Sequence, residues 1–244
     1  MQWRTRHSVY ALGFWVALMV VLPMSATYGA ETEPGVVKTI DFTGQPAGSA
    51  VSWLRANGFE LRLDANSLDP RFSDKGLELS TDSRTAGLFA RKLDVTGANR
   101  IRIVWGVERY PDGAGWDSGV YRVPIAVMAA FGDQKIGSGS MFLPSAPYFI
   151  GLFLSQDATP GKAYTANHYH LGGRYFCDPC SPTAGETVTT EFDLDQAFLE
   201  TFDASEVPPI TGFSFQMNTK DTRGGAHSYI KRVEFLARNG DGAS

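Results

Sequence analysis

The sequence predicts an all-β fold, a sandwich or barrel, with one short helix. Segments rich in Val, Ile, Phe, Tyr and Thr recur along the chain, and clusters of Gly, Asp, Asn and Pro separate them at fairly regular spacing. Several segments alternate apolar and polar residues with a period of two, which is typical of strands with one buried face. Without the first thirty of its 244 residues, the chain suits one domain with a full core.

The strand segments differ in how cleanly their two faces separate. In 100–108 one face is fully apolar, so we expect it to be buried. In 228–237 both faces mix polar and apolar residues, which favours a strand near a sheet edge or rim. The apolar face of 100–108 consists of Ile101, Ile103, Trp105 and Val107. The expected strands are 37–43, 59–63, 86–93, 100–110, 119–131, 147–155, 186–194, 210–218 and 228–237.

One short helix is expected at 194–203, where the sequence reads LDQAFLETFD. Asp195 is the expected N-cap, and Phe198 and Phe202 would lie one turn apart on the same side. We expect a linker over 31–36, a single domain over 37–238 and a frayed tail over 239–244.

The first thirty residues have the order of a secretory signal peptide. Arg4 and Arg6 form a basic start, an uncharged apolar run covers 8–22, and small residues follow Pro23. The run is shorter than the ~20 residues that a membrane-spanning helix needs. We therefore expect cleavage between residues 26 and 30, and a periplasmic or secreted protein.

The charge balance and hydropathy exclude several partners. The formal charge is −4 and becomes −6 without residues 1–30, because Arg4 and Arg6 are the only charged residues there. A mildly acidic protein has no electrostatic footprint for nucleic acid or an anionic membrane surface. No later apolar stretch is long enough to span a bilayer, so no stable membrane span is expected. The sequence does not determine the oligomeric state.

The stretch HYHLGGRYFCDPC (168–180) gathers two of the four histidines and both cysteines. Its LGGR predicts a two-residue hairpin turn, which would place His168, His170 and Cys177 on one face. In an oxidising compartment the simplest use of the cysteines is a Cys177–Cys180 disulfide. The alternative is a zinc or copper site formed by His168, His170, Cys177 and Cys180.

The loop ERYPDGAGWDSG (108–119) carries the first group of candidate ligand-binding residues. Tyr110 and Trp116 are expected to present their rings to solvent, where rings can stack on the faces of sugars. Asp117 is expected to pair with Arg122, five residues further on, and so to shape the loop.

The loop MNTKDTRGGAH (217–227) carries the second group. Its oxygen-bearing residues Asn218, Thr219, Asp221 and Thr222, with His227 beyond them, are typical of loops that hold calcium or sugar hydroxyls, although such side chains more often stabilise turns. The candidate ligand-binding residues are therefore Tyr110, Trp116, Asp117, Arg122, Asn218, Asp221 and His227.

Several of these positions resemble an exported bacterial family, the domain-of-unknown-function family 3047. The shared features are a strand with a tryptophan, an Asp five residues before an Arg, an acidic strand-to-helix stretch and a polar loop before a closing strand, whereas the family's Trp-Arg-Trp run is here Val104-Trp105-Gly106. The resemblance covers roughly residues 40–236. It implies a jelly-roll-like β-sandwich of two antiparallel sheets, similar to carbohydrate-binding modules, and it implies no activity. The matching residues are Trp105, Asp117, Arg122, Asp193, Asn218, Thr219, Asp221, Gly224, Tyr229 and Phe235.

The motifs favour a binding protein over an enzyme. The sequence contains no Gly-x-Ser-x-Gly elbow, Walker loop, His-Glu-x-x-His or EF-hand. We expect an exported, non-catalytic protein that binds a carbohydrate or cell-envelope glycan through its loops. The alternatives are a periplasmic zinc- or copper-binding protein and a polysaccharide-acting enzyme with a tyrosine or histidine base.

Overall fold

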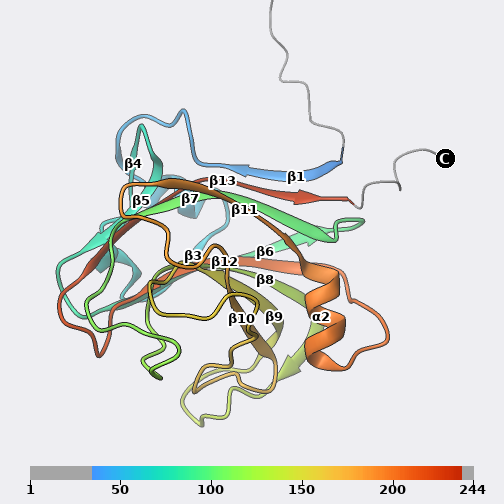
Figure 1. Ribbon diagram of the computed structural model, residues 1–244. Helices are drawn as coiled ribbons and strands as arrows, with labels where there is room; N and C mark the ends of the chain where they lie inside the picture. The colour runs from blue at the N-terminus through green and yellow to red at the C-terminus, as the bar shows by residue number, and fades with distance from the viewer. Residues whose placement is uncertain (1–34, 238–244) are drawn as a thin grey trace, which may run out of the picture. The chain divides into compact units, whose positions relative to one another are not determined.

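The computed structural model describes residues 35–237, which form two β-sheets packed face to face around one hydrophobic core (Figure 1). The jelly-roll-like β-sandwich that we predicted is confirmed. Strand pairing is antiparallel except between β9 and β10, which run parallel. The expected signal peptide and the tail over 239–244 lie outside the described residues.

Sheet A forms one layer, and β13 lies at its centre between β7 and β5. Its strand order is β11-β7-β13-β5-β4-β2, and β1 also pairs with β13. The strands are β1 (Val36–Asp41), β2 (Gly48–Ser49), β4 (Arg71–Ser73), β5 (Gly76–Thr81), β7 (Arg100–Arg109), β11 (Thr187–Asp193) and β13 (Ala226–Leu236).

Sheet B forms the other layer, in the order β10-β9-β8-β12-β6-β3. Two α-helices and one 3₁₀ helix connect strands, whereas the sequence predicted one helix. The helices are α1 (Val51–Ala56), η1 (Ala65–Leu68) and α2 (Leu194–Phe202). The strands are β3 (Glu60–Leu63), β6 (Ala86–Val95), β8 (Val123–Ile136), β9 (Ala146–Phe153), β10 (Gly173–Cys177) and β12 (Ile210–Asn218).

The core contains the apolar face predicted for 100–108. Ile101, Ile103 and Trp105 are each at most 1% exposed. The indole nitrogen of Trp105 donates a hydrogen bond to Thr190 Oγ1 at 3.0 Å, so the only polar atom of the ring is paired within the core. The period-two pattern therefore identified the buried side of β7 correctly.

The prediction that 228–237 lies at a sheet edge is wrong, because β13 has neighbours on both sides. Its pairing with β7 shifts between Ile230 and Arg232, which leaves Lys231 as the extra residue of a β-bulge. The bulge lets Ile230 and Val233 both reach the core. The mixed faces of the sequence thus reflect a bulge rather than an exposed edge.

Helix α2 spans the predicted residues, but its N-cap lies two residues earlier than predicted. Its N-cap is Asp193, whose carboxylate accepts a hydrogen bond from the Gln196 backbone N–H at 2.8 Å, and Asp195 lies in the first turn. Phe198 and Phe202 do lie one turn apart, with ring centroids separated by 4.9 Å. Within residues 35–237, no helix combines the length and apolarity needed to cross a bilayer.

Candidate functional site

A second apolar cluster covers part of the outer face of sheet B, the face that points away from sheet A. The connecting segments 110–122 and 155–172 supply Trp116 and Tyr164, which pack on side chains of β8, β9 and β10. We call this region the covered half. Its buried members are Trp116, Val123, Ala126, Met128, Phe149, Phe153, Tyr164, Tyr175 and Cys177.

The register of sheet B places a different set of side chains on the same outer face. One row across the strands joins Arg62, Leu88 and Gln216 to Ala126, and the next joins Glu60, Ala90 and Ser214 to Met128. Paired residues share a face of a sheet, so β3, β6 and β12 continue the outer face beyond the covered half. We call this region the open half. It consists of Glu60, Arg62, Leu88, Ala90, Lys92, Ser214 and Gln216, all of which are partly or fully exposed.

Tyr175 connects the two halves. A Cβ atom on Gly151 of β9 would lie 2.6 Å from Tyr175 Cδ1, so the tyrosine ring lies directly over this glycine. Burial raises the pKa of the Tyr175 hydroxyl, the nearby Tyr169 adds to this effect, and the neighbouring Gln216 side chain acts in the opposite direction. The ring therefore extends from β10 across β9 and brings its hydroxyl to the border of the open half.

Tyr169 marks another border of the open half. Its backbone N–H donates to the Ser138 carbonyl at 2.8 Å, and its hydroxyl donates to the Pro144 carbonyl at 3.0 Å. Burial raises the pKa of Tyr169, while the nearby positive charge of Arg62 acts in the opposite direction and less strongly. The ring is thus held by the β8–β9 connection, close to the guanidinium that β3 contributes.

The open half combines hydrogen-bonding groups with small apolar side chains. The guanidinium of Arg62 pairs with Glu60 at 2.6 Å. Within residues 35–237, the side chains of Ser214 and Lys92 have no hydrogen-bond or ion-pair partner. Together, the amide of Gln216, the hydroxyl of Ser214 and the charged side chains of the open half offer both donors and acceptors of hydrogen bonds. Such a surface is able to bind a ligand rich in hydroxyl groups.

Trp116 and Tyr110 do not present their rings to solvent, so this expectation is wrong. Trp116 is 4% exposed, stacks on Phe153 with ring centroids 4.2 Å apart, and donates its indole N–H to the Arg122 carbonyl at 3.2 Å. The Tyr110 hydroxyl donates to the Pro182 carbonyl at 2.9 Å, and burial raises its pKa. Trp116 is buried and Tyr110 is half-buried, because segments distant in the sequence pack against both rings.

The expected Asp117–Arg122 pair is also wrong. The Asp117 carboxylate accepts hydrogen bonds from Lys162 Nζ at 2.7 Å, Thr159 Oγ1 at 2.8 Å and Tyr164 Oη at 2.8 Å. These hydrogen bonds, led by the one from Lys162, lower the pKa of Asp117 to about 2. Asp117 therefore ties the 110–122 segment to the 155–172 segment.

We expect Asp117→Asn to make the free energy of unfolding less dependent on pH in the acidic range. A carboxyl group with a lowered folded-state pKa stabilises the fold above its unfolded pKa of ~3.9. This contribution is lost as the pH falls through the folded value of about 2. Between pH ~4 and ~2, the variant should lose less stability than the unsubstituted protein. Thermal unfolding across this range tests the expectation, and parallel curves for the two proteins would contradict it.

Arg122 connects two loops at one end of the sandwich. It forms an ion pair with Asp221 and donates from Nε to the Lys220 carbonyl at 2.7 Å. Nearby, Arg223 Nε donates to Asp112 Oδ2 at 2.8 Å. Arg122, Asp221, Arg223 and Asp112 of these loops are therefore paired with one another, which leaves few of their charged groups for a ligand.

His227 lies in strand β13, not in the loop where we expected it. It contacts the Glu78 carboxylate and lines a pocket of about 440 Å³ on sheet A, together with Arg71 and Ser80. Asn218 remains at the loop and accepts a hydrogen bond from the Lys220 backbone N–H at 3.1 Å. The candidate ligand-binding residues are thus divided among separate places. Calcium binding by the loop stays a prediction.

The predicted hairpin over 168–177 is wrong. Residues 168–171 form turns, with Tyr169 at a φ of 62°, and β10 pairs in parallel with β9. Cys177 and Cys180 form the expected disulfide. The face that was to bring His168 and His170 to the cysteine sulfurs does not exist. Residues 35–237 contain no group of three or more His, Cys, Asp or Glu side chains placed to hold a metal ion.

Comparison with known proteins identifies no family for this chain. No protein-family model matches the sequence, so the resemblance to family 3047 receives no support beyond the β-sandwich that it implied. No curated protein matches either.

Two solved structures match this chain at low similarity. One is described as a xylan-binding module CBM15, with 11% identity, a TM-score of 0.34, and coverage of 84% of this chain and 98% of that one. The other is the K2 cleaved adhesin domain of Lys-gingipain, with 12% identity, a TM-score of 0.28, and coverage of 82% and 88%. The class of the protein, a two-sheet β-sandwich, follows from its own strand pairing.

Sequence reasoning overlooked the open half, although one signal for it was present. In 210–218 the apolar residues Phe213, Phe215 and Met217 alternate with Ser214 and Gln216. This alternation predicts one buried face and one polar face. It does not reveal which strands lie beside the polar face or whether a loop covers it.

Proposed function

We propose that this chain is an exported, non-catalytic protein that binds a carbohydrate or cell-envelope glycan on the open half of sheet B. One observation carries the proposal. Packed aromatic rings cover one half of this sheet face, whereas the other half carries the partly or fully exposed Arg62, Ser214 and Gln216 without such a cover. Export is inferred from the signal-peptide pattern of the first thirty residues.

The chemistry of the open half suits a sugar polymer. Sugars offer hydroxyl groups at their rims and C–H groups on their faces, so they require donors, acceptors and apolar surface together. Gln216 and Ser214 supply donors and acceptors, and Leu88 and Ala90 supply apolar surface between them. A sheet face is broad and shallow, whereas a small-molecule site is usually a concave pocket that encloses its ligand.

The outer face of sheet A is less suited to this role because several of its charges neutralise one another, whereas the open half contains one such pair, Arg62 with Glu60. Arg100 Nη1 lies 2.7 Å from Glu191, and Arg102 contacts both Glu191 and Glu234 at 3.2 Å. Arg232 also reaches Glu234. A ligand on this face would have to displace ion pairs before its own hydrogen bonds formed.

We expect Gln216→Ala and Arg62→Ala each to weaken binding to a recognised polysaccharide by roughly fivefold to tenfold. The reason is that each substitution removes hydrogen bonds worth ~1 kcal/mol or more, and ~1.4 kcal/mol corresponds to a factor of ten. Affinity electrophoresis against a panel of neutral and acidic polysaccharides would identify the ligand. Calorimetry with its oligosaccharides would then measure the effect of each substitution.

Lys38→Ala serves as the matched control, since Lys38 is an exposed residue of β1 on sheet A. It should leave binding unchanged. Loss of binding in Asp221→Ala, with Gln216→Ala unaffected, would place the site on the loops instead. Reducing-end assays on the same polysaccharides should show no cleavage. Cleavage that His227→Ala abolishes would support the enzyme alternative.

A further inference from the structure

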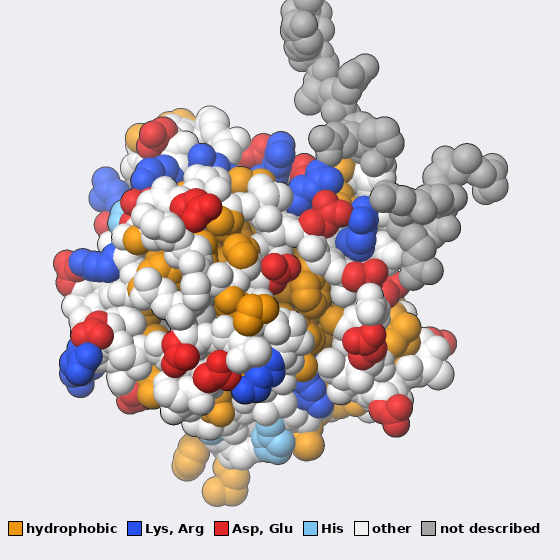
Figure 2. Space-filling view, viewed as in Figure 1, with side chains coloured by type: hydrophobic (Ala, Val, Ile, Leu, Met, Phe, Trp, Pro, Cys, Tyr) orange, Lys and Arg blue, Asp and Glu red, His pale blue; other side chains and the backbone are white. Residues whose placement is uncertain are grey.

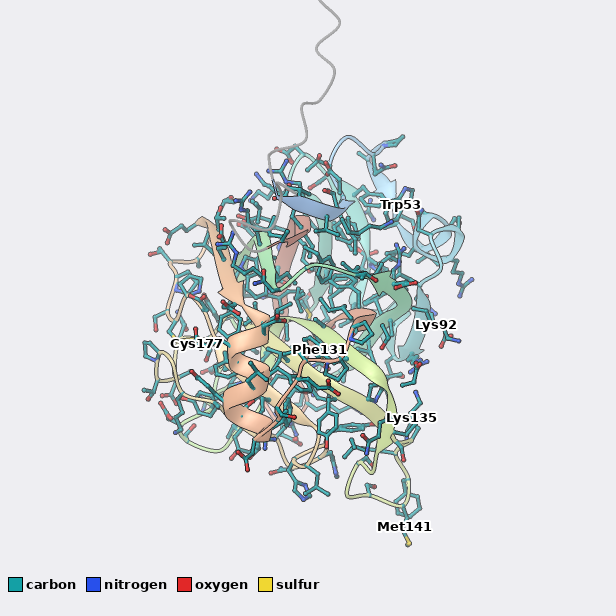
Figure 3. All side chains as sticks on the ribbon, turned by 90° about the vertical axis from the view of Figure 1, so that its right-hand side faces the viewer. Trp53, Lys92, Phe131, Lys135, Met141 and Cys177 are labelled. Atoms are coloured by element: carbon teal, nitrogen blue, oxygen red, sulfur yellow. A yellow bond between two sulfur atoms is a disulfide. The ribbon has the colours of Figure 1, made fainter. Side chains whose placement is uncertain are left out.

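The connection between β8 and β9 ends in two apolar side chains that project into solvent. Met141 is 95% exposed and Phe142 is 91% exposed, whereas no other large apolar residue within 35–237 exceeds 65%. Figure 3 shows Met141 at the far end of this connection, away from the sheets. In Figure 2, apolar side chains project from the bottom of the molecule, where Figure 1 places the same connection. We call residues 139–143 the apolar tip.

Hydrogen bonds at its base hold the apolar tip in shape. Ser138 is 2% exposed, and its hydroxyl lies 3.0 Å from the Ser140 carbonyl and 2.9 Å from the Leu143 carbonyl. The Ser138 carbonyl in turn accepts the Tyr169 N–H at 2.8 Å. Hydrogen bonds thus fix a loop conformation that exposes Met141 and Phe142. Exposure of apolar side chains to water is unfavourable, so this conformation costs free energy.

The exposed area is small for a protein partner. Single exposed apolar residues are common, but two adjacent and almost fully exposed ones at a tip indicate a contact site. Side chains of this size expose on the order of 400 Å² together. A stable protein interface buries ~800 Å² on each partner and requires a matching surface. A lipid bilayer requires neither a minimum area nor a complementary shape.

The charge near the apolar tip agrees with a lipid surface. Residues 134–156, which contain the apolar tip, and residues 158–177, which include Tyr169 at its base, contain no Asp or Glu, although Asp133 and Asp157 border them. They contribute the cations Lys135, Lys162 and Arg174, of which Lys162 is paired with Asp117, and the histidines His168 and His170. Anionic headgroups attract nearby Lys and Arg side chains, so this end of the molecule would face the bilayer.

We propose that the apolar tip inserts Met141 and Phe142 into the interface of a lipid bilayer and so holds the protein reversibly at a membrane surface. Net charge alone argued against a membrane surface, but insertion of apolar side chains does not depend on net charge. Binding should be weak, because even a single acyl chain gives only marginal attachment. This site is independent of the proposed glycan site on sheet B.

Sedimentation of the purified protein with vesicles of phosphatidylethanolamine and phosphatidylglycerol tests the proposal. We expect the double substitution Met141→Ser with Phe142→Ser to lower the partition coefficient by about tenfold or more, because it removes most of the apolar area. Phe142→Trp should retain binding, and brominated lipids should quench its added fluorescence. Unfolding curves of all variants should coincide, since the substituted side chains contact little of the fold.

Leu63→Ser provides the control, because Leu63 is 65% exposed but lies at the opposite end of sheet B. It should leave vesicle binding unchanged. The proposal is overturned if the double variant binds vesicles as well as the unsubstituted protein does. It is also overturned if light scattering shows that the unsubstituted protein dimerises and the double variant does not, since the tip would then contact a second copy.

Discussion

Trp116→Ala is expected to lower the free energy of unfolding by ~3–5 kcal/mol, as removal of a buried Trp side chain typically does. Trp116 is 4% exposed and lies against four aromatic rings of the covered half, with centroid distances from 4.2 to 5.6 Å. Its removal would leave a cavity between sheet B and the segments above it. Urea unfolding followed by circular dichroism measures the effect.

Trp105→Ala provides the comparison, because Trp105 is fully buried between the sheets. The two losses of stability should be similar in size. Trp53→Ala should cost less, since Trp53 is only partly buried beside the core. If Trp116→Ala lowered stability by less than ~1 kcal/mol, the ring would be mobile and accessible. The original expectation of a sugar-stacking loop would then regain support.

Gly151→Ala is expected to reduce both stability and glycan binding. The added Cβ would lie 2.6 Å from Tyr175 Cδ1 and 3.2 Å from Met128 Cγ, so the tyrosine ring must move. Overpacking of this kind typically costs ~1–3 kcal/mol. Displacement of the ring would also withdraw the Tyr175 hydroxyl from Gln216. Under the proposed function, binding should therefore weaken as it does in Gln216→Ala.

Gly137→Ala is the matched control for this substitution. A Cβ at Gly137 would have no neighbour within 4 Å, so stability and binding should both remain unchanged. A near-ultraviolet circular dichroism change in Gly151→Ala, absent in Gly137→Ala, would report movement of the aromatic cluster. Normal binding despite that change would show that the position of Tyr175 does not influence the open half.

Several features could be predicted from short stretches of sequence because neighbouring residues determine them. The alternation of Ile101 and Ile103 with charged residues identified the buried face of β7. The spacing of Phe198 and Phe202 identified helix α2. Cys177 and Cys180 had only each other as partners, and they form the disulfide.

Other features depended on which segments become neighbours in space. Trp116 was placed at the surface because Gly, Asp and Ser surround it in sequence, yet Tyr164 and Tyr175 cover it. Asp117 was paired with an arginine five residues away, yet its carboxylate binds Lys162, 45 residues further along the chain. The LGGR sequence predicted a hairpin, but β10 pairs in parallel with β9 and no hairpin forms.

The sequence by itself determined that this protein is an all-β sandwich, which side of β7 faces the core, and which two cysteines pair. Only the tertiary structure decided that Trp116 is buried and that Gln216, Ser214 and Arg62 share one open surface. The physical reason is the range of the interactions. Periodicity along a strand is a property of adjacent residues, whereas the partner of a strand, and the loop that covers its outer face, are chosen by packing between segments far apart in the chain.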